Sequence, residues 1–384
     1  MRVQIHGLAG NNLLPAFQKN SIDLVSAQVY RYSIPFKQPV QIKNGSLSTR
    51  QGLLLSVRDS QGNTGVSEAS PLPGYSQESL ETTLLNVTVL LDKLIGRGEF
   101  TPSCLPEMGH TMESSSPSMA RYGIETALLA LLARQHGILL GDLVFERSSS
   151  KVPINGLIAG NISDWIPEAQ NAISNGFQTL KFKVGRVNSE LEARSLEEVR
   201  RVVGPNIKLR LDANRSWNLE TAIHFGKVVK SLDIEYIEEP LQNPADLPIF
   251  YDACSVPFAF DETLHHMVDP RISFDTYTGL KALVMKPTLI SCTSRFLSLV
   301  KRAREKGVQT ILSSSYESDV GLIRLSQMAS AISGEDIAVG LDTRSALAGG
   351  TTKIPVAIEN GWMSVRSIDE EDLDLSLCEI LYER

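Results

Sequence analysis

The chain has 384 residues, a length that suits a barrel of roughly 250 residues together with a second, smaller domain. Its composition is 42% hydrophobic and 21% charged, with a net charge of −7 at pH 7, which is typical of a soluble globular protein and argues against a nucleic-acid partner. Four scattered cysteines without a CxxC pair exclude a zinc ribbon or a disulfide scaffold and favour a reduced compartment. No apolar run approaches the ~18 residues of a membrane span, so we expect a cytoplasmic protein without a membrane partner.

The first part of the chain is expected to form an α+β domain, residues 22–150, after a leader, residues 1–21, that shows no clear period. Alternation of apolar and polar residues predicts half-buried strands, and apolar residues three to four apart predict helices. The expected elements are strands at 25–32, 52–57 and 64–68 and helices at 77–95 and 120–136. Strands that are joined by short turns pair antiparallel, so the strands of this domain should form an antiparallel sheet.

A loop rich in proline and glycine, residues 70–78, separates this sheet from the first helix. It carries an aromatic residue, Tyr75, near its tip. Such loops lie on the surface and often carry function. Two interpretations stay open for it: a lid over the mouth of the barrel that follows, and a plain connector.

Residues 151–353 alternate between strands and helices at intervals of roughly 25 residues, which is the pattern of βα units in a parallel barrel. The expected strands are residues 152–159, 179–184, 207–212, 234–240, 257–262, 282–287, 309–312 and 337–340. The expected helices between them include residues 164–174, 190–203, 219–232 and 292–306. The acidic tail, residues 354–384, no longer follows this pattern and is expected to return to the first domain.

Charged residues stand at the ends of five successive strands of this barrel. They are Lys183, Asp212, Glu238, Asp261 and Lys286. A strand with two lysines is, by itself, more often a solvated surface strand, because lysine is seldom buried unpaired. The C-terminal ends of barrel strands meet at one mouth, however, so these five residues are expected to form a ring there. This ring is the predicted functional site.

The side-chain period of two along a strand sorts the neighbours of the ring. Lys181 and Arg210 lie on the inward face, two residues before members of the ring. An inward arginine is most often a structural partner of an acid, but at this level it could also reach an anionic substrate. Glu239 and Glu262 leave the opposite face, so we expect them to support the ring or to face the helices.

Three carboxylates in one ring repel one another unless a positive charge lies among them. Oxygen ligands without histidine or cysteine suit a hard divalent cation, so Asp212, Glu238 and Asp261 are predicted to bind Mg²⁺, with Mn²⁺ as a substitute. A nearby cation and partial burial would lower the pKa of Lys183 and of Lys286 towards the range of a general base. A cation that holds a carboxylate, with a base on each face, can remove the proton α to that carboxylate.

Five motifs in this order resemble the signature of the enolase superfamily, in its muconate-lactonizing subgroup. They are Lys181-Phe182-Lys183, Asp212-Ala213-Asn214, Glu238-Glu239-Pro240, Asp261-Glu262 and Lys286-Pro287. The resemblance extends from about Val25 over nearly all of the chain. It implies an α/β fold, a (β/α)7β TIM-like barrel, with an α+β capping domain built from the N-terminal part and the C-terminal tail. It also implies that Lys183 and Lys286 face each other across Mg²⁺.

Within this subgroup, four further stretches look like the o-succinylbenzoate synthase family. They are residues 26–35, 71–78, 313–322 and 340–343. The resemblance implies dehydration of 2-succinyl-6-hydroxy-2,4-cyclohexadiene-1-carboxylate to 2-succinylbenzoate in menaquinone biosynthesis. Lys183 would take the α-proton and then protonate the leaving hydroxyl, and Lys286 would stabilise the enolate as a cation. The expected substrate contacts are Lys181, Arg210, Asn214, Ser313, Ser314 and Gly340.

Other functions stay open at this point. An N-acylamino-acid racemase or a muconate cycloisomerase would use the same two lysines. A dipeptide epimerase usually has a second acid on the eighth strand, where this chain reads Asp342-Thr343-Arg344. A non-catalytic barrel that binds a small acid has no need of two opposed lysines. In each case the partner is a small-molecule carboxylate, and the chain is compatible with a monomer or a homo-oligomer.

Overall fold

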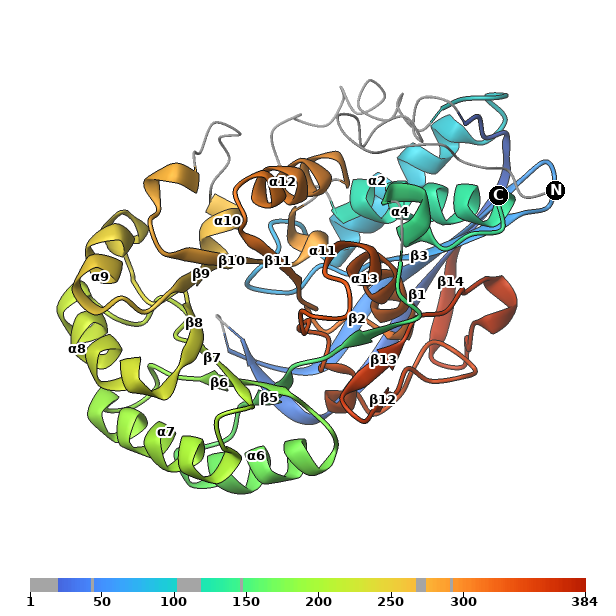
Figure 1. Ribbon diagram of the computed structural model, residues 1–384. Helices are drawn as coiled ribbons and strands as arrows, with labels where there is room; N and C mark the ends of the chain where they lie inside the picture. Colours follow the sequence, from blue (N-terminus) through green and yellow to red (C-terminus); the bar gives the residue numbers. More distant parts are fainter. Residues whose placement is uncertain (1–19, 43–44, 102–118, 146–147, 267–273, 291–292) are drawn as a thin grey trace.

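The computed structural model describes residues 20–42, 45–101, 119–145, 148–266, 274–290 and 293–384. Of the predicted leader, residues 1–19 lie outside this part of the chain. Two units stand side by side in Figure 1: a ring of parallel strands surrounded by helices, and an antiparallel sheet that carries α2 and α4. The predicted fold class, a TIM-like barrel with an α+β cap, is therefore confirmed.

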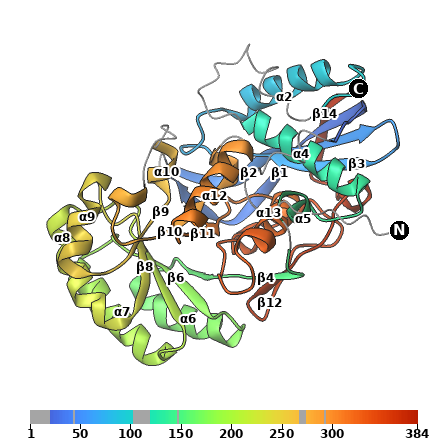
Figure 2. The same ribbon diagram turned by 45° about the horizontal axis from the view of Figure 1, so that its top comes forward.

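The capping domain contains a four-stranded antiparallel sheet in the order β14-β1-β2-β3. Its strands are β1 (Leu24–Ile42), β2 (Gly45–Asp59), β3 (Thr64–Ala69) and β14 (Cys378–Glu383), and the helices of this part are α2 (Leu80–Leu94), α4 (Met119–Gln135) and α5 (Leu140–Val144). Figure 2 shows α2 and α4 lying across one face of the sheet. α2 begins at Ser79, whose hydroxyl accepts a hydrogen bond from the backbone N–H of Thr82 and so satisfies one of the free donors of the helix.

The barrel sheet has seven parallel strands in the order β11-β10-β9-β8-β7-β6-β5. They are β5 (Gly156–Ile158), β6 (Thr179–Lys183), β7 (Lys208–Asp212), β8 (Ile234–Glu238), β9 (Phe258–Phe260), β10 (Leu280–Met285) and β11 (Gln309–Leu312). A cluster of buried side chains from these strands packs together, namely Tyr236, Ala259, Ala282, Val284 and Ile311. Below its mouth the barrel is therefore a packed core rather than a pore.

The predicted eighth strand is much shorter than residues 337–340. Val339 and Gly340 close the barrel through parallel bridges to Ile154 and Ser313. The backbone N–H of Gly340 donates to the carbonyl oxygen of Leu312 at 2.8 Å. These few bonds close the barrel sheet, so that β5 and β11 lie on either side of residues 339 and 340.

The predicted first strand is divided into two. β4 (Lys151–Pro153) pairs antiparallel with β13 (Trp362–Ser364), and only β5 joins the barrel sheet. The tail consequently contacts both units: β12 (Ile358–Glu359) and β13 pair beside β4, whereas β14 pairs with β1 of the capping sheet. Strands of two or three residues are too short to show a period, which is why the pairing of the tail with β4 is not visible in the sequence.

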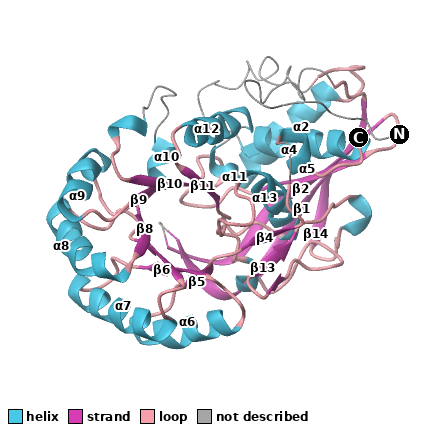
Figure 3. Cartoon of the chain, in the orientation of Figure 1, coloured by secondary structure: helices cyan, strands magenta, loops and turns pink. Residues whose placement is uncertain are grey.

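Most of the remaining helices surround the barrel strands in Figure 3. They are α6 (Trp165–Ser174), α7 (Ser189–Val203), α8 (Leu219–Val229), α9 (Leu247–Cys254), α10 (Glu262–His266), α11 (Pro287–Ile290), α12 (Thr293–Glu305) and α13 (Asp319–Ile332). α7 illustrates how local sequence sets their bounds. The Asn188 side chain accepts from two backbone N–H groups of its first turn, and Gly204, with φ of 78°, follows its last residue, a conformation that glycine adopts without strain. Among the described residues, no helix combines the length and the apolar character that crossing a membrane requires.

Candidate active site

A pocket of about 230 Å³ opens at the C-terminal ends of the barrel strands. The order of the strands divides its wall into two halves. The half from β6 to β10 is charged and carries Lys181, Lys183, Asp212, Asn214, Glu262 and Lys286. The half from β11 through Gly340 to β5 carries mostly uncharged residues, Asn155, Leu157, Ser313, Ser314, Gly340 and Thr343, together with one acid, Asp342. Eight of the eleven predicted site residues thus line one pocket.

The three predicted metal ligands lie on neighbouring strands. Asp212 is in register with Lys183 of β6 on one side and with Glu238 of β8 on the other. Asp261 follows β9, the next strand in the sheet. Asp212, Glu238 and Asp261 are 1%, 0% and 1% exposed. Asp212 reaches the pocket wall, and the other two acids lie beneath it.

Each of these acids contacts a lysine. Lys183 Nζ donates to Asp212 Oδ2 at 2.6 Å. Lys181 Nζ lies 2.9 Å from Asp212 Oδ2 and 2.8 Å from Glu238 Oε1. Lys286 Nζ donates to Asp261 Oδ2. Lys183 and Lys286 therefore stand at β6 and β10, with the three strands that carry the acids between them.

Burial and mutual charge set the pKa values of these groups. Burial raises the pKa of Glu238 well above its usual value, and the charge of Asp212 adds to the rise. Burial also acts to raise the pKa of Asp212, but the adjacent lysines outweigh it and lower this pKa. Burial acts to lower the pKa of Lys286, yet Asp261 and Glu238 outweigh it and raise this pKa above its usual value. Carboxylates are the nearest charges to the ammonium group of Lys286, and they favour its charged form. The lowering of this pKa by a bound cation stays a prediction.

The donors at this site are of the type that Mg²⁺ prefers, since Mg²⁺ binds carboxylate oxygens and keeps its other positions for water or substrate. A cation would also offset the cost of burying the charge of Glu238, whose pKa is raised by burial. Within the described residues, however, no three acidic, histidine or cysteine side chains form a ready metal-binding group, because each acid is turned to a lysine. The residues fit a divalent cation by donor type and burial.

Glu262 lies at the pocket and supports the ring through Asn214, which is one of the two placements expected for it. β9 ends at Phe260 and α10 begins at Glu262, so the period of two no longer applies there. Its Oε1 accepts from Asn214 Nδ2 at 2.9 Å, and Asn214 Oδ1 accepts from Lys183 Nζ at 2.8 Å. Glu239 is a supporting group, as expected, since its Oε1 accepts a hydrogen bond of 2.7 Å from the backbone N–H of Asp261.

The predicted substrate contacts on the other half of the pocket form a hydroxyl cluster. Ser313 Oγ and Ser314 Oγ lie 3.3 and 3.2 Å from the carbonyl oxygen of Gly340, and Ser314 Oγ shares a hydrogen bond of 2.7 Å with Thr343. A Cβ atom on Gly340 would meet Ser313 Oγ at 2.8 Å. Glycine at this position therefore keeps the wall of the pocket close to the serines.

The predicted contact between Arg210 and the substrate needs correction. Arg210 is 0% exposed and does not line the pocket. It lies within the barrel, where Nε donates to Glu235 Oε2 at 2.6 Å and Nη1 donates to the carbonyl oxygen of Ala338 at 2.7 Å. Lys181, in register with it on β6, does line the pocket, so the side chain of Arg210 is kept from the mouth by these partners and not by its level in the strand. Its connection to the pocket runs through Asn155, 3.3 Å from Nη1, which does line the pocket.

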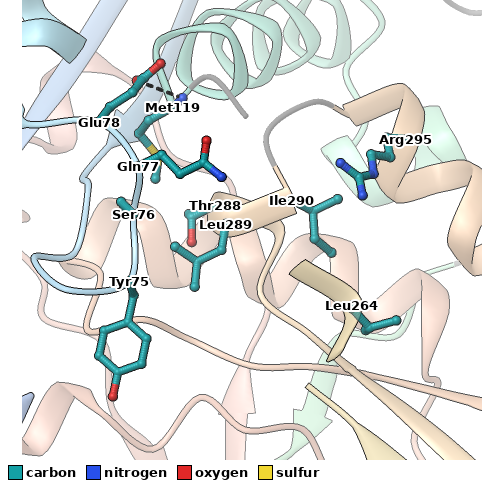
Figure 4. A pocket seen from close by; sticks show the side chains of 10 residues that line it. All are labelled: Tyr75, Ser76, Gln77, Glu78, Met119, Leu264, Thr288, Leu289, Ile290 and Arg295. Carbon is teal, nitrogen blue, oxygen red and sulfur yellow. Dashed lines mark hydrogen bonds between the residues drawn. The ribbon is translucent and has the colours of Figure 1, made fainter. Parts of the chain in front are cut away.

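The capping domain completes the wall with residues that the sequence did not single out as contacts. Leu72 and Tyr75 come from residues 70–78, so this loop belongs to the pocket wall, which favours the lid interpretation over a plain connector. Figure 4 shows Tyr75 pointing away from Glu78, the other end of the loop. Further lining residues outside the motifs are Gln41, Ile42, Arg186 and Leu289. Tyr316 and Asp342 also line the pocket and come from the stretches 313–322 and 340–343.

Two family descriptions and several known sequences match the chain. Residues 164–368 match the enolase C-terminal domain-like family, and residues 24–131 match the MenC N-terminal domain. The o-succinylbenzoate synthase of Vibrio cholerae serotype O1 is 30% identical over 329 residues, which cover 83% of this chain and 89% of that protein. Protein PHYLLO, chloroplastic, of Arabidopsis thaliana is 31% identical over 344 residues, which cover 84% of this chain and 20% of that much longer protein.

Solved structures share the fold at lower identity. The substrate-liganded L-Ala-D/L-Glu epimerase from Bacillus subtilis has a TM-score of 0.78 at 20% identity and covers 92% of this chain and 99% of its own. The muconate lactonizing enzyme from Pseudomonas fluorescens, complexed with muconolactone, has a TM-score of 0.75 at 16% identity. The match covers 92% of this chain and 96% of that enzyme. At such identities these similarities concern the fold, and the two reactions differ from each other.

Proposed function

The chain is an enzyme that belongs to the enolase superfamily, and from this premise we propose that it is an o-succinylbenzoate synthase. Its reaction would be the Mg²⁺-dependent dehydration of 2-succinyl-6-hydroxy-2,4-cyclohexadiene-1-carboxylate to 2-succinylbenzoate, a step of menaquinone and phylloquinone biosynthesis. The observation that carries the proposal is the pair Lys183 and Lys286 on opposite sides of one pocket, with three buried acids between them. The MenC match and the named synthases support the choice of this reaction within the superfamily.

Lys183 is the proposed base. Its Nζ takes the proton from the carbon α to the ring carboxylate, and the ammonium group so formed gives a proton to the departing hydroxyl. The C–O bond breaks, water leaves, and the ring becomes aromatic. Both proton transfers take place at one nitrogen, so the elimination is syn. Asp212 and Asn214, at 2.6 and 2.8 Å from Nζ, hold the amine at the pocket wall.

Lys286 is the proposed cationic group on the opposite side. Asp261 holds its ammonium group at the pocket, where the positive charge can stabilise the enolate that forms when the α-proton is removed. Among the described residues, Lys183 contacts an acid and an amide, whereas Lys286 contacts an acid. This difference supports different roles for the two lysines.

Asp212, Glu238 and Asp261 are the residues that would hold Mg²⁺, or Mn²⁺ in its place. Bound there, the cation would act as a Lewis acid for the substrate carboxylate. The contribution of the chain itself is to fix three acids on adjacent strands and to bury them almost completely. Burial excludes water from the carboxylates and strengthens their interaction with any cation.

The eighth-strand motif argues against a dipeptide epimerase. Asp342 lines the pocket, but Arg344 Nε donates to Asp319 Oδ1 at 2.6 Å, outside the pocket. The site thus offers one acid at this position where such epimerases use two. N-acylamino-acid racemase activity is the alternative that the two opposed lysines leave open.

Product formation tests the proposed function directly. We expect the purified chain to convert the cyclohexadiene acid to an aromatic product with Mg²⁺ present, measured as a rise in ultraviolet absorbance, and to lose this activity in EDTA. Racemisation of an N-acylamino acid without any aromatic product from the cyclohexadiene acid would contradict the proposal and favour the racemase.

The succinyl carboxylate of the substrate needs hydrogen-bond donors on the half of the pocket away from the acids. Ser314 is well placed to supply one. We expect Ser314→Ala to raise KM about tenfold with kcat within about twofold, because a bond to a non-reacting group is equally strong in the ground state and the transition state. Ser330→Ala is the control, since Ser330 is a buried serine whose hydroxyl donates within α13, away from the pocket. An unchanged KM in Ser314→Ala would show that this hydroxyl only supports Gly340 and Thr343.

A further inference from the structure

Arg50, on β2 of the capping sheet, is 1% exposed. Its guanidinium donates to four backbone carbonyl oxygens: from Nε to Tyr316 at 3.0 Å, from Nη1 to Gln51 at 2.9 Å and Pro71 at 2.8 Å, and from Nη2 to Ser70 at 2.6 Å. Buried arginines are usually paired with carboxylates. Arg50 instead donates hydrogen bonds to backbone carbonyl groups.

The four carbonyl groups belong to three segments that are far apart in the sequence. Gln51 lies in β2, Ser70 and Pro71 begin the capping loop of residues 70–78, and Tyr316 follows β11 of the barrel. These segments approach closely, since a Cβ atom on Gly52 would lie 2.6 Å from the Cβ of Ser70. Arg50 therefore joins the capping sheet, the capping loop and a barrel loop at one point.

Both of the joined loops form walls of the substrate pocket. The capping loop contributes Leu72 and Tyr75, and the barrel loop contributes Tyr316. Tyr316 has φ of 61°, in the left-handed region, which is uncommon for a residue with a Cβ atom and needs support from outside. Arg50 supports its carbonyl group, and Phe36 packs edge-on against its ring at 5.4 Å between centroids.

The charge of Arg50 acts on a buried acid of the barrel loop, Glu317. Burial raises the pKa of Glu317, Glu68 raises it further, and the charge of Arg50 opposes this rise. Glu68, on β3, accepts from the backbone N–H groups of Ser318 and Gly321, each within 3.1 Å, at the beginning of α13. Two charged groups of the capping domain, Arg50 and Glu68, thus bind backbone of the segment between β11 and the first turns of α13.

The capping loop is also fixed at its other end and internally. Glu78 Oε2 accepts from the backbone N–H of Met119 at 3.1 Å, drawn as a dashed line in Figure 4. Ser76 Oγ accepts from the backbone N–H of Leu72 at 2.8 Å. The position of Tyr75 thus depends on bonds at both ends of the loop, and those at its first two residues are made by Arg50.

We propose that Arg50 is a positioning residue for the reaction. Through the carbonyl groups of Pro71 and Tyr316 it holds the capping wall and the barrel wall at the separation that encloses the part of the substrate remote from Lys183. This inference rests on the proposed function, because it takes the pocket as the place where the substrate binds. A lysine cannot replace Arg50, since its donors radiate from one nitrogen whereas the carbonyl groups lie around a planar fork.

The test compares Arg50→Lys with Arg58→Lys in the full chain. Arg58 lies on the same strand, and its guanidinium meets Glu370 at the surface at 2.6 Å. We expect Arg50→Lys to raise KM for the cyclohexadiene acid at least about tenfold with kcat within about threefold, because the wall contacts a non-reacting part of the substrate. Backbone amides of residues 70–78 and 313–318 should exchange with deuterium at least about tenfold faster. Arg58→Lys should match the unchanged chain in both measurements.

Wild-type KM and wild-type exchange in folded Arg50→Lys would overturn the proposal, and so would a lower Tm without any change in these two quantities. If the unchanged chain does not convert the cyclohexadiene acid, the proposed function fails, but the exchange measurement still tests the position of the loops.

If circular dichroism shows that Arg50→Lys does not fold, Ser76→Ala replaces it. Ser76 is half-buried, and losing its bond to Leu72 should raise KM about threefold and speed exchange in residues 70–78. No change in either quantity would again overturn the proposal.

Discussion

Glu238→Gln is expected to abolish turnover and to weaken the binding of Mg²⁺. Glu238 is fully buried on the central strand of the three that carry acids, so its charge acts on any cation at close range and without screening by water. The amide keeps the size of the side chain and removes the charge. We expect kcat to fall at least about 10³-fold, or ~4 kcal/mol, because the substrate carboxylate would lose its Lewis acid.

Two measurements separate this effect from a loss of folding. Titration with Mn²⁺, followed by electron paramagnetic resonance, should show weaker binding in Glu238→Gln, while circular dichroism shows a folded protein, because the amide removes a buried charge that costs free energy. Glu198→Gln is the control, since Glu198 is exposed on α7. EDTA-treated enzyme that is as active as enzyme with Mg²⁺ restored would contradict the predicted metal site altogether.

The longer periodic elements of the fold could be predicted from the sequence. The helix expected at residues 77–95 is α2 (Leu80–Leu94), and the one expected at residues 120–136 is α4 (Met119–Gln135). Their apolar spacing persists over several turns, so that small errors at the ends do not hide it. The eighth strand could not be predicted at its true length, because two bridging residues depend on neighbouring strands and not on any pattern of their own.

The ring of acids and lysines could be predicted because it depends on two simple facts, the place of each residue at a strand end and the convergence of those ends. Arg210 shows where this reasoning stops. The side-chain period of two gives the face of the strand from which Arg210 leaves, but not its partners, Glu235 and Ala338, which keep its side chain out of the pocket.

Residues that act across the two domains could not be predicted at all. Arg50 and Tyr316 lie far apart in the sequence, and their contact depends on how the capping sheet docks on the barrel. A single sequence carries no pattern for such a contact.

The cellular compartment also stays a prediction, since PHYLLO, one of the similar proteins, is named as chloroplastic.

The largest effect on chemistry is expected from Lys183→Ala. If Lys183 handles both protons, its removal should lower kcat by about 10⁴-fold, at the upper end of the range for general acid–base catalysis. Turnover alone cannot separate the two lysines, because Lys286→Ala also removes a charge that the enolate needs. Exchange of the α-proton with solvent separates them, since it requires the base but no elimination.

The exchange experiment uses D₂O and a substrate analogue that lacks the leaving hydroxyl. Lys286→Ala should still introduce deuterium at the α-carbon through Lys183, more slowly than the unchanged enzyme, whereas Lys183→Ala should introduce none. Lys208→Ala, which changes an exposed lysine at the first residue of β7, is the control and should exchange at the normal rate. Exchange that persists without Lys183 and vanishes without Lys286 would reverse the two roles. If each variant instead kept exchange from one enantiomer of a chiral analogue and lost it from the other, both lysines would be bases on opposite faces of the substrate. That is the chemistry of a racemase, and the one-base dehydration would then be wrong.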